Sequence, residues 1–235
     1  MRRAGLQCAR RPRVRVLATG SELRTSGTPL APGEIYESNG VLLAAQLATA
    51  GAAADVLDPV ADDESALRPA LARALEADVL VSSGGVSVGP HDLVRALLAE
   101  LGVEEVFWGV AVRPGKPVFF GTWGETLVFG LPGNPVSSLV GFELLVRPAL
   151  EALQGARPGP EFRPGRLAVA LRRNAARDQL ARAVSRVEDG EVVLEPLGGQ
   201  ESHMIVRAAA ADALVLVPRG DGELAAGAHV SWLRV

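Results

Sequence analysis

Short apolar runs alternate with longer stretches of helical periodicity through the first part of the chain. The apolar runs predict buried strands over residues 14–18, 54–60, 78–82, 106–112, 118–121 and 127–130. Between them, apolar positions three and four residues apart predict helices over residues 39–50, 63–77, 92–101 and 134–153. This alternation is typical of helices covering both faces of a mostly parallel sheet. We therefore expect a three-layer α/β/α domain over residues 14–155.

The last predicted helix carries clear start signals. Asn134 stands in the cap position and Pro135 in the first turn, where each residue type is favoured. Pro148 lies inside the same helix and is expected to bend it, because proline lacks the backbone N–H.

The pattern changes after residue 155. Residues 156–165 are rich in proline and glycine and predict a linker. Short strands are then predicted over residues 167–171, 181–187, 192–196, 213–217 and 230–235, with Asp189 and Gly190 in a hairpin turn. We expect a small β-barrel-like domain or sandwich over residues 166–235, a size at which an independent core is marginal but feasible.

Composition narrows the classes of protein. The 235 residues suggest one or two domains, and 48% hydrophobic residues allow a sizeable core. A formal net charge of −3 argues against general nucleic-acid binding. Cys8 is the only cysteine, which excludes an intrachain disulfide and a cysteine-based metal site. Because no apolar run approaches the ~20 residues of a membrane span and no secretory signal is visible, we expect a cytoplasmic protein without nucleic-acid or membrane partners.

Arginines gather near the N-terminus, at positions 2, 3, 10, 11, 13 and 15. Basic arms can bind nucleic acid or membranes, but they are more often solvated tails. We interpret residues 1–13 as a solvated arm or linker remnant.

Glycine-rich turns follow or adjoin three predicted strand ends. The first covers residues 82–92, the second residues 113–117 and the third residues 131–137. Ligands of open α/β sheets bind beyond the carboxyl ends of the strands, where glycines let backbone N–H groups approach an oxyanion. Each turn alone is explained by tight-turn geometry, but together they favour an anion site. The candidate ligand-binding residues are Gly84, Gly85, Ser87, Gly89, Arg113, Lys116, Gly133, Asn134 and Ser137.

Lys116 is the only lysine among 24 cationic side chains. Lysine is a compact charge on a flexible stem, whereas arginine is a planar fork, so the two are not equivalent at an anion. The alternative to a functional role is that codon bias replaced lysine by arginine elsewhere and that this one lysine survived by chance.

Carboxylates also follow consecutive predicted strands. Glu22 follows the first, Asp62 and Asp63 the second, and Asp92 the third. Carboxylates beside a phosphate site suggest Mg²⁺, which binds one or two carboxylates together with substrate phosphates. Asp63 and Asp92 could instead be helix caps, and Glu22 an exposed loop charge. As a set, we favour Glu22, Asp62 and Asp92 as catalytic and metal-binding residues.

Gly85, Ser87 and Gly89 match a G-x-S-x-G nucleophile elbow between a strand and a helix. A serine hydrolase would pair Ser87 with an aspartate and a histidine, from Asp178, Asp212, His203 and His229. The pattern is short, and Gly89 and Pro90 separate the serine from the helix, so we keep this as a remote alternative.

Five segments occur together in order: residues 19–23 (TGSEL), 37–39 (ESN), 83–92 (SGGVSVGPHD), 113–117 (RPGKP) and 131–137 (LPGNPVS). This set resembles the MoeA/gephyrin E-domain family of molybdopterin molybdenumtransferases. The resemblance is strong over about residues 13–155, and the β-rich tail is similar to that family's C-terminal domain. It implies the MogA-like molybdopterin-binding fold followed by a barrel-like domain.

The resemblance also implies a reaction. The family inserts molybdate into the dithiolene of adenylylated molybdopterin and releases AMP, with Mg²⁺ or a similar divalent ion. By position, Glu22, Asp62 and Asp92 match family acidic residues linked to metal handling and catalysis. Arg113 and Lys116 match a cationic pair suited to molybdate and phosphate oxygens, and the Ser137 hydroxyl could donate to an oxyanion. A homodimer is implied, in which N-terminal elements of the partner complete the cleft.

The chain departs from the family pattern at three positions and in length. The family usually has Asp at positions 21 and 37 and Lys at 113, where this chain has Ser21, Glu37 and Arg113. The family's two preceding domains are absent, so the chain could be a fragment or could work with a separate polypeptide. The alternatives to an insertion enzyme are a non-catalytic molybdopterin-binding module and a MogA-type molybdopterin adenylyltransferase.

Overall fold

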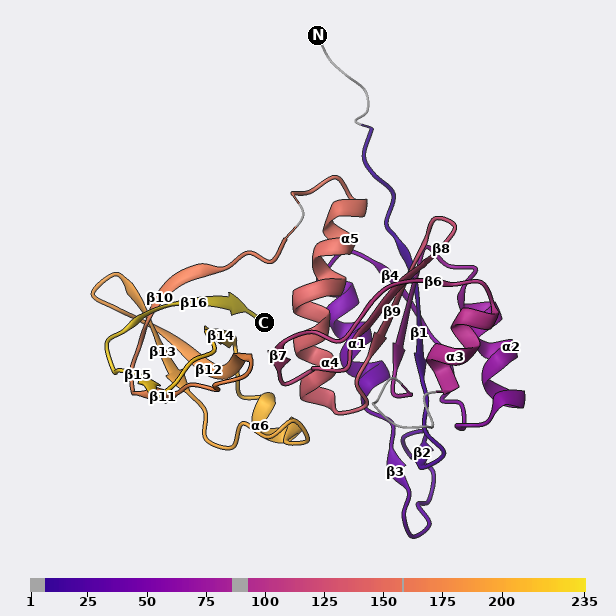
Figure 1. The fold of residues 1–235 in the computed structure, drawn as a ribbon, viewed down its shortest axis with the longest axis horizontal. Helices are drawn as coiled ribbons and strands as arrows, with labels where there is room; N and C mark the ends of the chain where they lie inside the picture. Colours follow the sequence, from indigo (N-terminus) through magenta and orange to yellow (C-terminus); the bar gives the residue numbers. More distant parts are fainter. Residues whose placement is uncertain (1–6, 86–92, 158) are drawn as a thin grey trace.

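The computed structural model describes residues 7–85, 93–157 and 159–235. A six-stranded sheet forms the first domain, in the order β4 (Ala53–Val56), β1 (Arg13–Ala18), β5 (Val79–Ser83), β9 (Thr126–Leu131), β8 (Phe119–Trp123) and β6 (Glu104–Trp108). The first four of these strands run parallel, whereas β8 runs antiparallel to both of its neighbours. The mostly parallel sheet expected from the sequence is therefore confirmed (Figure 1).

Helices cover both faces of this sheet. On one face, α2 (Glu64–Ala74) and α3 (Leu93–Glu100) pack Leu67, Leu71 and Leu98, all fully buried, against β1 and β5. On the other face lie α1 (Asn39–Thr49) and the helical run that begins at residue 135. Burying one such leucine contributes about 1.5–3 kcal/mol. The layers follow from these two apolar cores, and the three-layer prediction is correct.

The predicted long helix is one continuous run with an irregular centre. It consists of α4 (Pro135–Gly141), the π-helical segment η1 (Phe142–Val146) and α5 (Arg147–Leu153). Pro148 lies in the first turn of α5, and the wider π turn directly precedes it. The bend expected at this proline stays a prediction, and the irregularity that the structure shows beside it is the π turn.

Two strand predictions were wrong in their extent. Residues 54–60 give only the short β4, because Pro59 cannot donate to a ladder, and Val60 rejoins the sheet through one bridge to Thr19. Residues 106–112 divide at Gly109, whose φ of +84° turns the chain between β6 and β7 (Val112–Arg113). A bulge in β6 and its exposed glutamates conceal the strand pattern.

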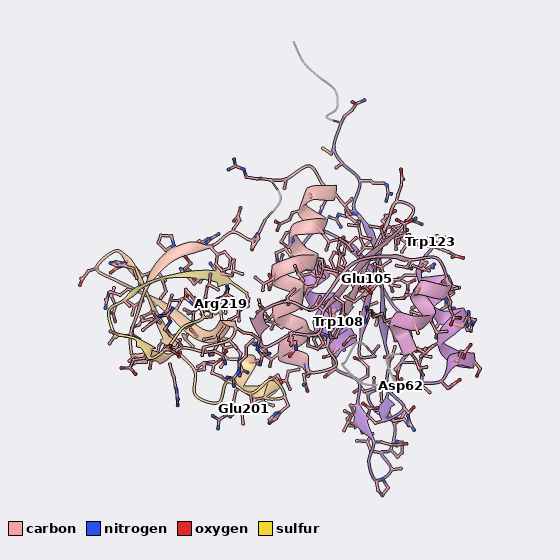
Figure 2. The ribbon with its side chains drawn as sticks, viewed as in Figure 1. Asp62, Glu105, Trp108, Trp123, Glu201 and Arg219 are labelled. Atoms are coloured by element: carbon pink, nitrogen blue, oxygen red, sulfur yellow. The ribbon has the colours of Figure 1, made fainter. Side chains whose placement is uncertain are left out.

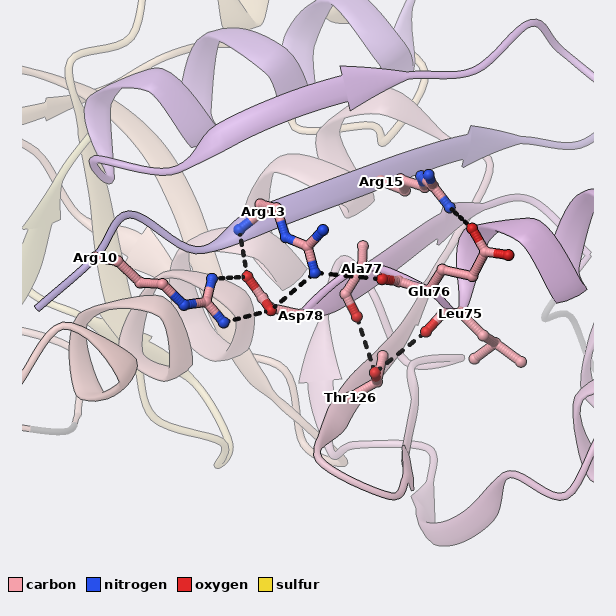
Figure 3. Close-up of polar contacts among 8 residues, drawn as sticks. All are labelled: Arg10, Arg13, Arg15, Leu75, Glu76, Ala77, Asp78 and Thr126. Atoms are coloured by element: carbon pink, nitrogen blue, oxygen red, sulfur yellow. Dashed lines mark hydrogen bonds and ion pairs between the residues drawn. The ribbon is translucent and has the colours of Figure 1, made fainter.

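The predicted arm is tied to the sheet at its end. Asp78 accepts hydrogen bonds from the Arg10 guanidinium (2.7 Å) and from the backbone N–H of Arg13 (2.8 Å) (Figure 3). These donors hold the pKa of Asp78 well below its usual range, with the Arg10 hydrogen bond as the largest cause. Nearby, the Thr126 hydroxyl donates to the carbonyl of Ala77 at 2.8 Å. The solvated-tail interpretation therefore fails for Arg10 and Arg13.

The second domain is a closed β-barrel, which settles the choice between barrel and sandwich. Its strands are β10 (Arg163–Leu167), β16 (His229–Arg234), β14 (Ala213–Val217), β12 (Asp178–Glu188) and β13 (Glu191–Pro196). Pairing of β13 with both β10 and β12 closes the ring. Asp189 and Gly190 have φ of +50° and +82° in the predicted hairpin. A short ribbon of β11 (Leu171–Arg172) and β15 (Glu223–Leu224) lies at one end, and α6 (Ile205–Ala208) follows β13.

The two domains share strands and an apolar interface. β7, from the first domain's chain segment, pairs in parallel with β12, with Arg113 opposite Gln179. A buried cluster joins Val140 of α4 to Leu180, Leu214 and Leu233 of the barrel. The domains therefore form one packed unit.

A small projection completes the fold. β2 (Leu23–Arg24) pairs in parallel with β3 (Ile35–Tyr36), and the loop between them extends beyond the sheet edge (Figure 1). Among the residues that the structure describes, no helix is long and apolar enough to cross a membrane.

Candidate functional site

Three loops meet at the carboxyl edge of the sheet. The parallel strands β1, β5 and β9 end there, and the antiparallel β8 begins there after the turn at residues 113–117. A Cβ added to Gly133 would lie 3.7 Å from the Cα of Gly84, and one added to Gly115 would lie 3.4 Å from the Ser137 carbonyl oxygen. The glycine segments singled out in the sequence are therefore neighbours in space.

A cavity of about 460 Å³ opens among these loops. Its lining comes from the ends of β1, β5 and β9, from the start of α1 and from the barrel domain. Residues of each origin include Thr19, Glu22, Ser83, Asn39, Asn134 and His203. Its volume lies in the range of small-molecule sites, about 300–1,000 Å³.

Asn39 organises the cavity wall. Its side-chain amide nitrogen donates to the Ser83 hydroxyl and to the Gly133 carbonyl, each at 2.7 Å. Asn39 is therefore the residue that ties the first helix to two of the glycine loops. The first turn of the same helix is capped by Glu37, whose carboxylate accepts from the N–H of Gly40 at 2.7 Å.

Two polar atoms of this wall lack partners. Thr19 and Asn39 are 5% and 8% exposed, and the Asn39 carbonyl oxygen makes no hydrogen bond within the described chain. The Thr19 hydroxyl makes no hydrogen bond of ordinary length, but it lies close enough to the Asp62 carboxylate to oppose the rise in its pKa. Leaving such a group unpaired costs about 1–3 kcal/mol. Unpaired buried atoms that line a cavity are candidates to bind a ligand.

The first glycine loop is a tight turn. Gly84 and Gly85 have φ of +95° and +64°, and a Cβ on Gly84 would lie 2.4 Å from the Thr19 carbonyl oxygen. The N–H of Gly84 donates to the Leu131 carbonyl at 3.0 Å, so it is not free for an oxyanion. Ser87, Gly89 and Asp92 lie outside the described residues.

The third loop connects the site to the barrel. Asn134 occupies the N-cap position of α4 without a side-chain capping bond. The N–H of Val136, in the first turn, donates to the carbonyl of Ser202 at 3.2 Å. Ser137 is 4% exposed at this junction. The start of α4 thus contacts the second domain directly.

The carboxylates divide into two roles. Asp63 caps α2 by accepting from the N–H of Ala66 at 2.9 Å, and its pKa is lowered first by the hydrogen bond from the Ser65 hydroxyl and then by this backbone bond. Asp62 shows the opposite shift: burial raises its pKa, and the nearby negative charge of Glu22 raises it further. The Ser21 hydroxyl accepts from the Asp62 N–H at 3.1 Å, which holds the loop in place. Asp62 lies at the base of the β2–β3 projection (Figure 2).

Glu22 and Asp62 form a carboxylate pair suited to a hard cation. Their mutual repulsion is the unfavourable interaction that a divalent ion would relieve, and carboxylate oxygens are the ligands Mg²⁺ prefers. Within residues 7–85, 93–157 and 159–235, no group of three or more acidic, histidine or cysteine side chains forms a complete metal site. A cation at this pair would need further ligands besides these two side chains.

The two cations of the second turn diverge. The backbone carbonyl of Lys116 accepts from the N–H groups of Val110 and Val118. Its side chain is exposed and makes no ion pair with a described residue. Arg113 lies in β7 and lines a second cavity, of about 570 Å³, at the barrel. These two residues therefore do not share one cavity wall.

His203 reaches the first cavity from the barrel domain, and Arg182 positions its loop. Arg182 is 1% exposed and donates to the carbonyls of Gly199 (2.6 Å) and Met204 (3.0 Å), on either side of the histidine. Burial lowers the pKa of Arg182. Sequence reasoning missed Thr19, Asn39 and His203 as cavity residues, because contacts between distant segments leave no local pattern.

The hydrolase alternative finds no triad among the described residues. Asp212 accepts from the backbone and hydroxyl of Ser185, and Asp178 accepts from the N–H of Arg219. His229 lies 3.6 Å from Glu191 on the barrel surface. Neither aspartate contacts a histidine, so both have structural roles.

Two family models match the chain consecutively. The model described as "Probable molybdopterin binding domain" matches residues 15–152, and "MoeA C-terminal region (domain IV)" matches residues 164–235. The fold and the site thus define a molybdopterin-binding α/β domain joined to a MoeA-type barrel. The chain belongs to the MoeA family.

Curated relatives and a solved structure agree. The chain is 39% identical over 231 residues to Molybdopterin molybdenumtransferase 2 of Mycobacterium tuberculosis, covering 94% of this chain and 56% of that protein. It is 32% identical to Molybdopterin molybdenumtransferase of Bacillus subtilis, covering 99% and 54%. A molybdopterin biosynthesis MoeA protein from Pyrococcus horikosii superposes with a TM-score of 0.80 at 30% identity, covering 96% and 55%. The chain spans about half the length of these relatives.

Proposed function

We propose that the chain binds adenylylated molybdopterin and inserts molybdate into its dithiolene, with release of AMP. The observation that carries this proposal is the cavity at the sheet edge, where loops of the molybdopterin-binding domain meet the barrel. It combines the Asn39 carbonyl oxygen and the Thr19 hydroxyl with the Glu22 carboxylate in its lining, whose negative charge acts on Asp62.

Charge neutralisation is the main requirement of this chemistry. Both molybdate and the phosphate groups of the adenylate are anions, so cleavage that releases AMP needs positive charge rather than a protein nucleophile. Lys116 would supply a mobile ammonium near the turn that contacts Ser137. Glu22 and Asp62, with Asp92 from outside the described residues, would hold Mg²⁺, which supplies charge neutralisation at phosphate oxygens when bound.

The remaining cavity residues would orient the substrate. The Asn39 carbonyl oxygen accepts and the Thr19 hydroxyl donates or accepts, so together they match a heterocycle with N–H and C=O groups. His203 would close the cavity from the barrel side, through the loop that Arg182 holds. Gly133 and Asn134 line the cavity, Gly85 belongs to the adjoining glycine turn, and Ser137 would donate from the start of α4.

The test is to incubate the purified chain with adenylyl-molybdopterin, molybdate and Mg²⁺ and to measure AMP release and substrate binding. We expect binding and AMP release. Binding without AMP release would favour a non-catalytic module, and ATP-dependent adenylylation of molybdopterin would favour the adenylyltransferase. Because relatives are about twice as long, the assay should be repeated with a separate polypeptide carrying the N-terminal domains, and the oligomeric state measured for the proposed homodimer.

Lys116 offers a sharper variant test. Lys116→Arg should lower molybdate affinity several-fold while leaving the melting temperature unchanged, because the side chain is exposed and only the compact ammonium is lost. Arg73→Lys, the reverse exchange at an exposed cation on α2, is the control. Unaltered molybdate affinity in Lys116→Arg would return this lysine to the codon-bias interpretation.

A further inference from the structure

The largest of the cavities described above lies away from the sheet-edge site, at the mouth of the barrel. It measures about 570 Å³ and is bounded by the β11–β15 ribbon, by the loops at residues 173–175 and 220–222, and by β7. Leu171, which packs on the barrel core, contributes apolar lining. Gln179 lies two residues before the core residue Ala181 on β12 and therefore belongs to the barrel-facing side of that strand.

The charge of this cavity is strongly positive. Arg113, Arg172 and Arg173 line it, against Asp221 as the acidic residue of the lining. Arg113 and Arg172 make no ion pair or side-chain hydrogen bond within the part of the chain that the structure describes. Glu223 lies opposite Arg172 in the β11–β15 register, but no ion pair joins the two side chains.

The amides of this lining differ in which of their groups are free, and the Gln200 amide nitrogen is already occupied by the carbonyls of Arg182 and Leu197. The Asn174 carbonyl oxygen already accepts from the N–H groups of Ala176 and Arg177, at 3.0 and 2.9 Å, so its amide nitrogen is left as a donor. The Gln179 side chain has no hydrogen-bond partner among the described residues. A donor-rich wall selects against cations and for oxyanions.

Arg173 is held in place by its own carbonyl partners. Its guanidinium donates to Pro218 O at 3.0 Å and to Arg219 O at 2.6 Å, which leaves further N–H groups free. A Cβ on Gly220 would lie 2.4 Å from this guanidinium, so a side chain at that position would displace the arginine. A fixed guanidinium loses little conformational freedom when it binds an anion.

We propose that this cavity is a second ligand site, which binds a small molecule carrying phosphate groups. Guanidinium groups bind phosphate oxygens in paired, charge-assisted hydrogen bonds, and three of them exceed what one tetrahedral ion needs. The volume also exceeds a single ion and suits a small organic phosphate or diphosphate. Arg113 is shared with the anion-binding residues that the family resemblance implies, whereas Arg172, Arg173, Asn174 and Gln179 line this cavity and not the sheet-edge cavity, so the test rests on Arg172.

The test is calorimetric titration of the full chain with sodium diphosphate and, in a separate arm, with AMP. Arg172→Gln should weaken diphosphate binding about tenfold or more, since a hydrogen bond to a charged group typically contributes that much. Asp221→Asn should tighten binding several-fold, because it removes the acidic residue of the lining. Arg73→Gln, the same charge change at an exposed position on α2, should leave affinity within twofold of wild type.

Absence of binding by the wild-type chain overturns the proposal, as does equal weakening by Arg172→Gln and Arg73→Gln. Weaker diphosphate binding by Asp221→Asn also counts against the proposal, because damage to the structure of the cavity would weaken binding whereas removal of a negative charge should tighten it. Tighter binding of AMP than of diphosphate, with the same dependence on Arg172, identifies a nucleotide rather than free diphosphate. Melting temperatures of all variants show whether each remains folded, and AMP release at the sheet-edge site is measured separately.

Discussion

Asp78 shows how a single carboxylate anchors the start of the fold. It accepts from the side chain of Arg10 and the backbone of Arg13, so it secures the chain just where β1 begins. We predict that Asp78→Asn lowers the free energy of unfolding at pH 7 by about 1–2 kcal/mol, because charge-assisted hydrogen bonds are lost. Urea unfolding monitored by circular dichroism measures this. Asp58→Asn, at an exposed aspartate, is the control and should change stability by less than about 0.5 kcal/mol.

Asp78 also makes the free energy of unfolding depend on pH in the acid range. The pKa of Asp78 is lowered in the folded chain. The contribution of its carboxylate to folding stability is therefore full above the ordinary aspartate pKa, and it is lost as the pH falls through the folded-state pKa. The stability difference between wild type and Asp78→Asn should therefore shrink as the pH falls below about 4. An unchanged difference at low pH would contradict this.

Asp62 carries the opposite shift, and it reports on the acidic pair. Its pKa is raised, first by burial and then by Glu22, so its charged form is disfavoured in the folded chain. The stability present below its ordinary pKa is lost as pH rises through the raised value. We predict that Glu22→Gln lowers the pKa of Asp62, measured by carbon-detected NMR titration. Glu125→Gln, in the β8–β9 turn, should leave that pKa unchanged.

Mg²⁺ provides an independent check on the same pair. A cation bound between Glu22 and Asp62 favours both charged forms, so added Mg²⁺ should lower the pKa of Asp62 in wild type and do so less in Glu22→Gln. No change on addition of Mg²⁺ would remove this pair from the candidate metal ligands.

At the scale of elements, the turn after β5 depends on its glycines. A Cβ on Gly85 would lie 2.3 Å from the buried Val94 side chain, at a φ of +64°. Gly85→Ala should destabilise the chain by about 1–3 kcal/mol more than Gly27→Ala, because Gly27 has a similar positive φ but open space around it. Chemical denaturation of both variants measures the difference. Equal losses would mean that backbone conformation alone matters there.

The regular elements were predictable and the irregular ones were not. Strand β5 is buried throughout and β1 and β9 are mostly buried, so their short apolar runs identify them. Strand β6 begins with two exposed glutamates, and β2 and β3 are two residues each, too short for any period. β7 exists only because a barrel strand pairs with it, and local sequence carries no record of such a partner.

The candidate site was predictable to the same degree. The loops at strand ends follow from sheet topology, which is why Gly84, Gly133 and Glu22 meet as expected. The central role of Asn39 depends on two side-chain bonds to segments 44 and 94 residues away, which no local spacing encodes. The same reason hides His203, which enters from the other domain.

At the scale of the whole molecule, the interface between domains should control cooperativity. Leu214 is fully buried and contacts Val140 and Leu180 across or beside this interface. We predict that Leu214→Ala costs about 2–5 kcal/mol and splits the calorimetric unfolding into two transitions, because the cavity it leaves uncouples the domains. Leu67→Ala, buried on the far face of the sheet, should destabilise the first domain without that splitting. A single unfolding transition in Leu214→Ala would show that the other contacts between the domains are sufficient to couple their unfolding.

Domain docking through β7, the apolar cluster and the Ser202 carbonyl also decides what the segment between α5 and β10 has to do. Since contacts elsewhere position the barrel, the connection only keeps the two domains in one chain, and its length does not set their relative position. Doubling its length with glycine and serine residues should add only about 0.6 kcal/mol of chain-closure entropy. The same docking would let the two halves, made as separate polypeptides, assemble into one working unit.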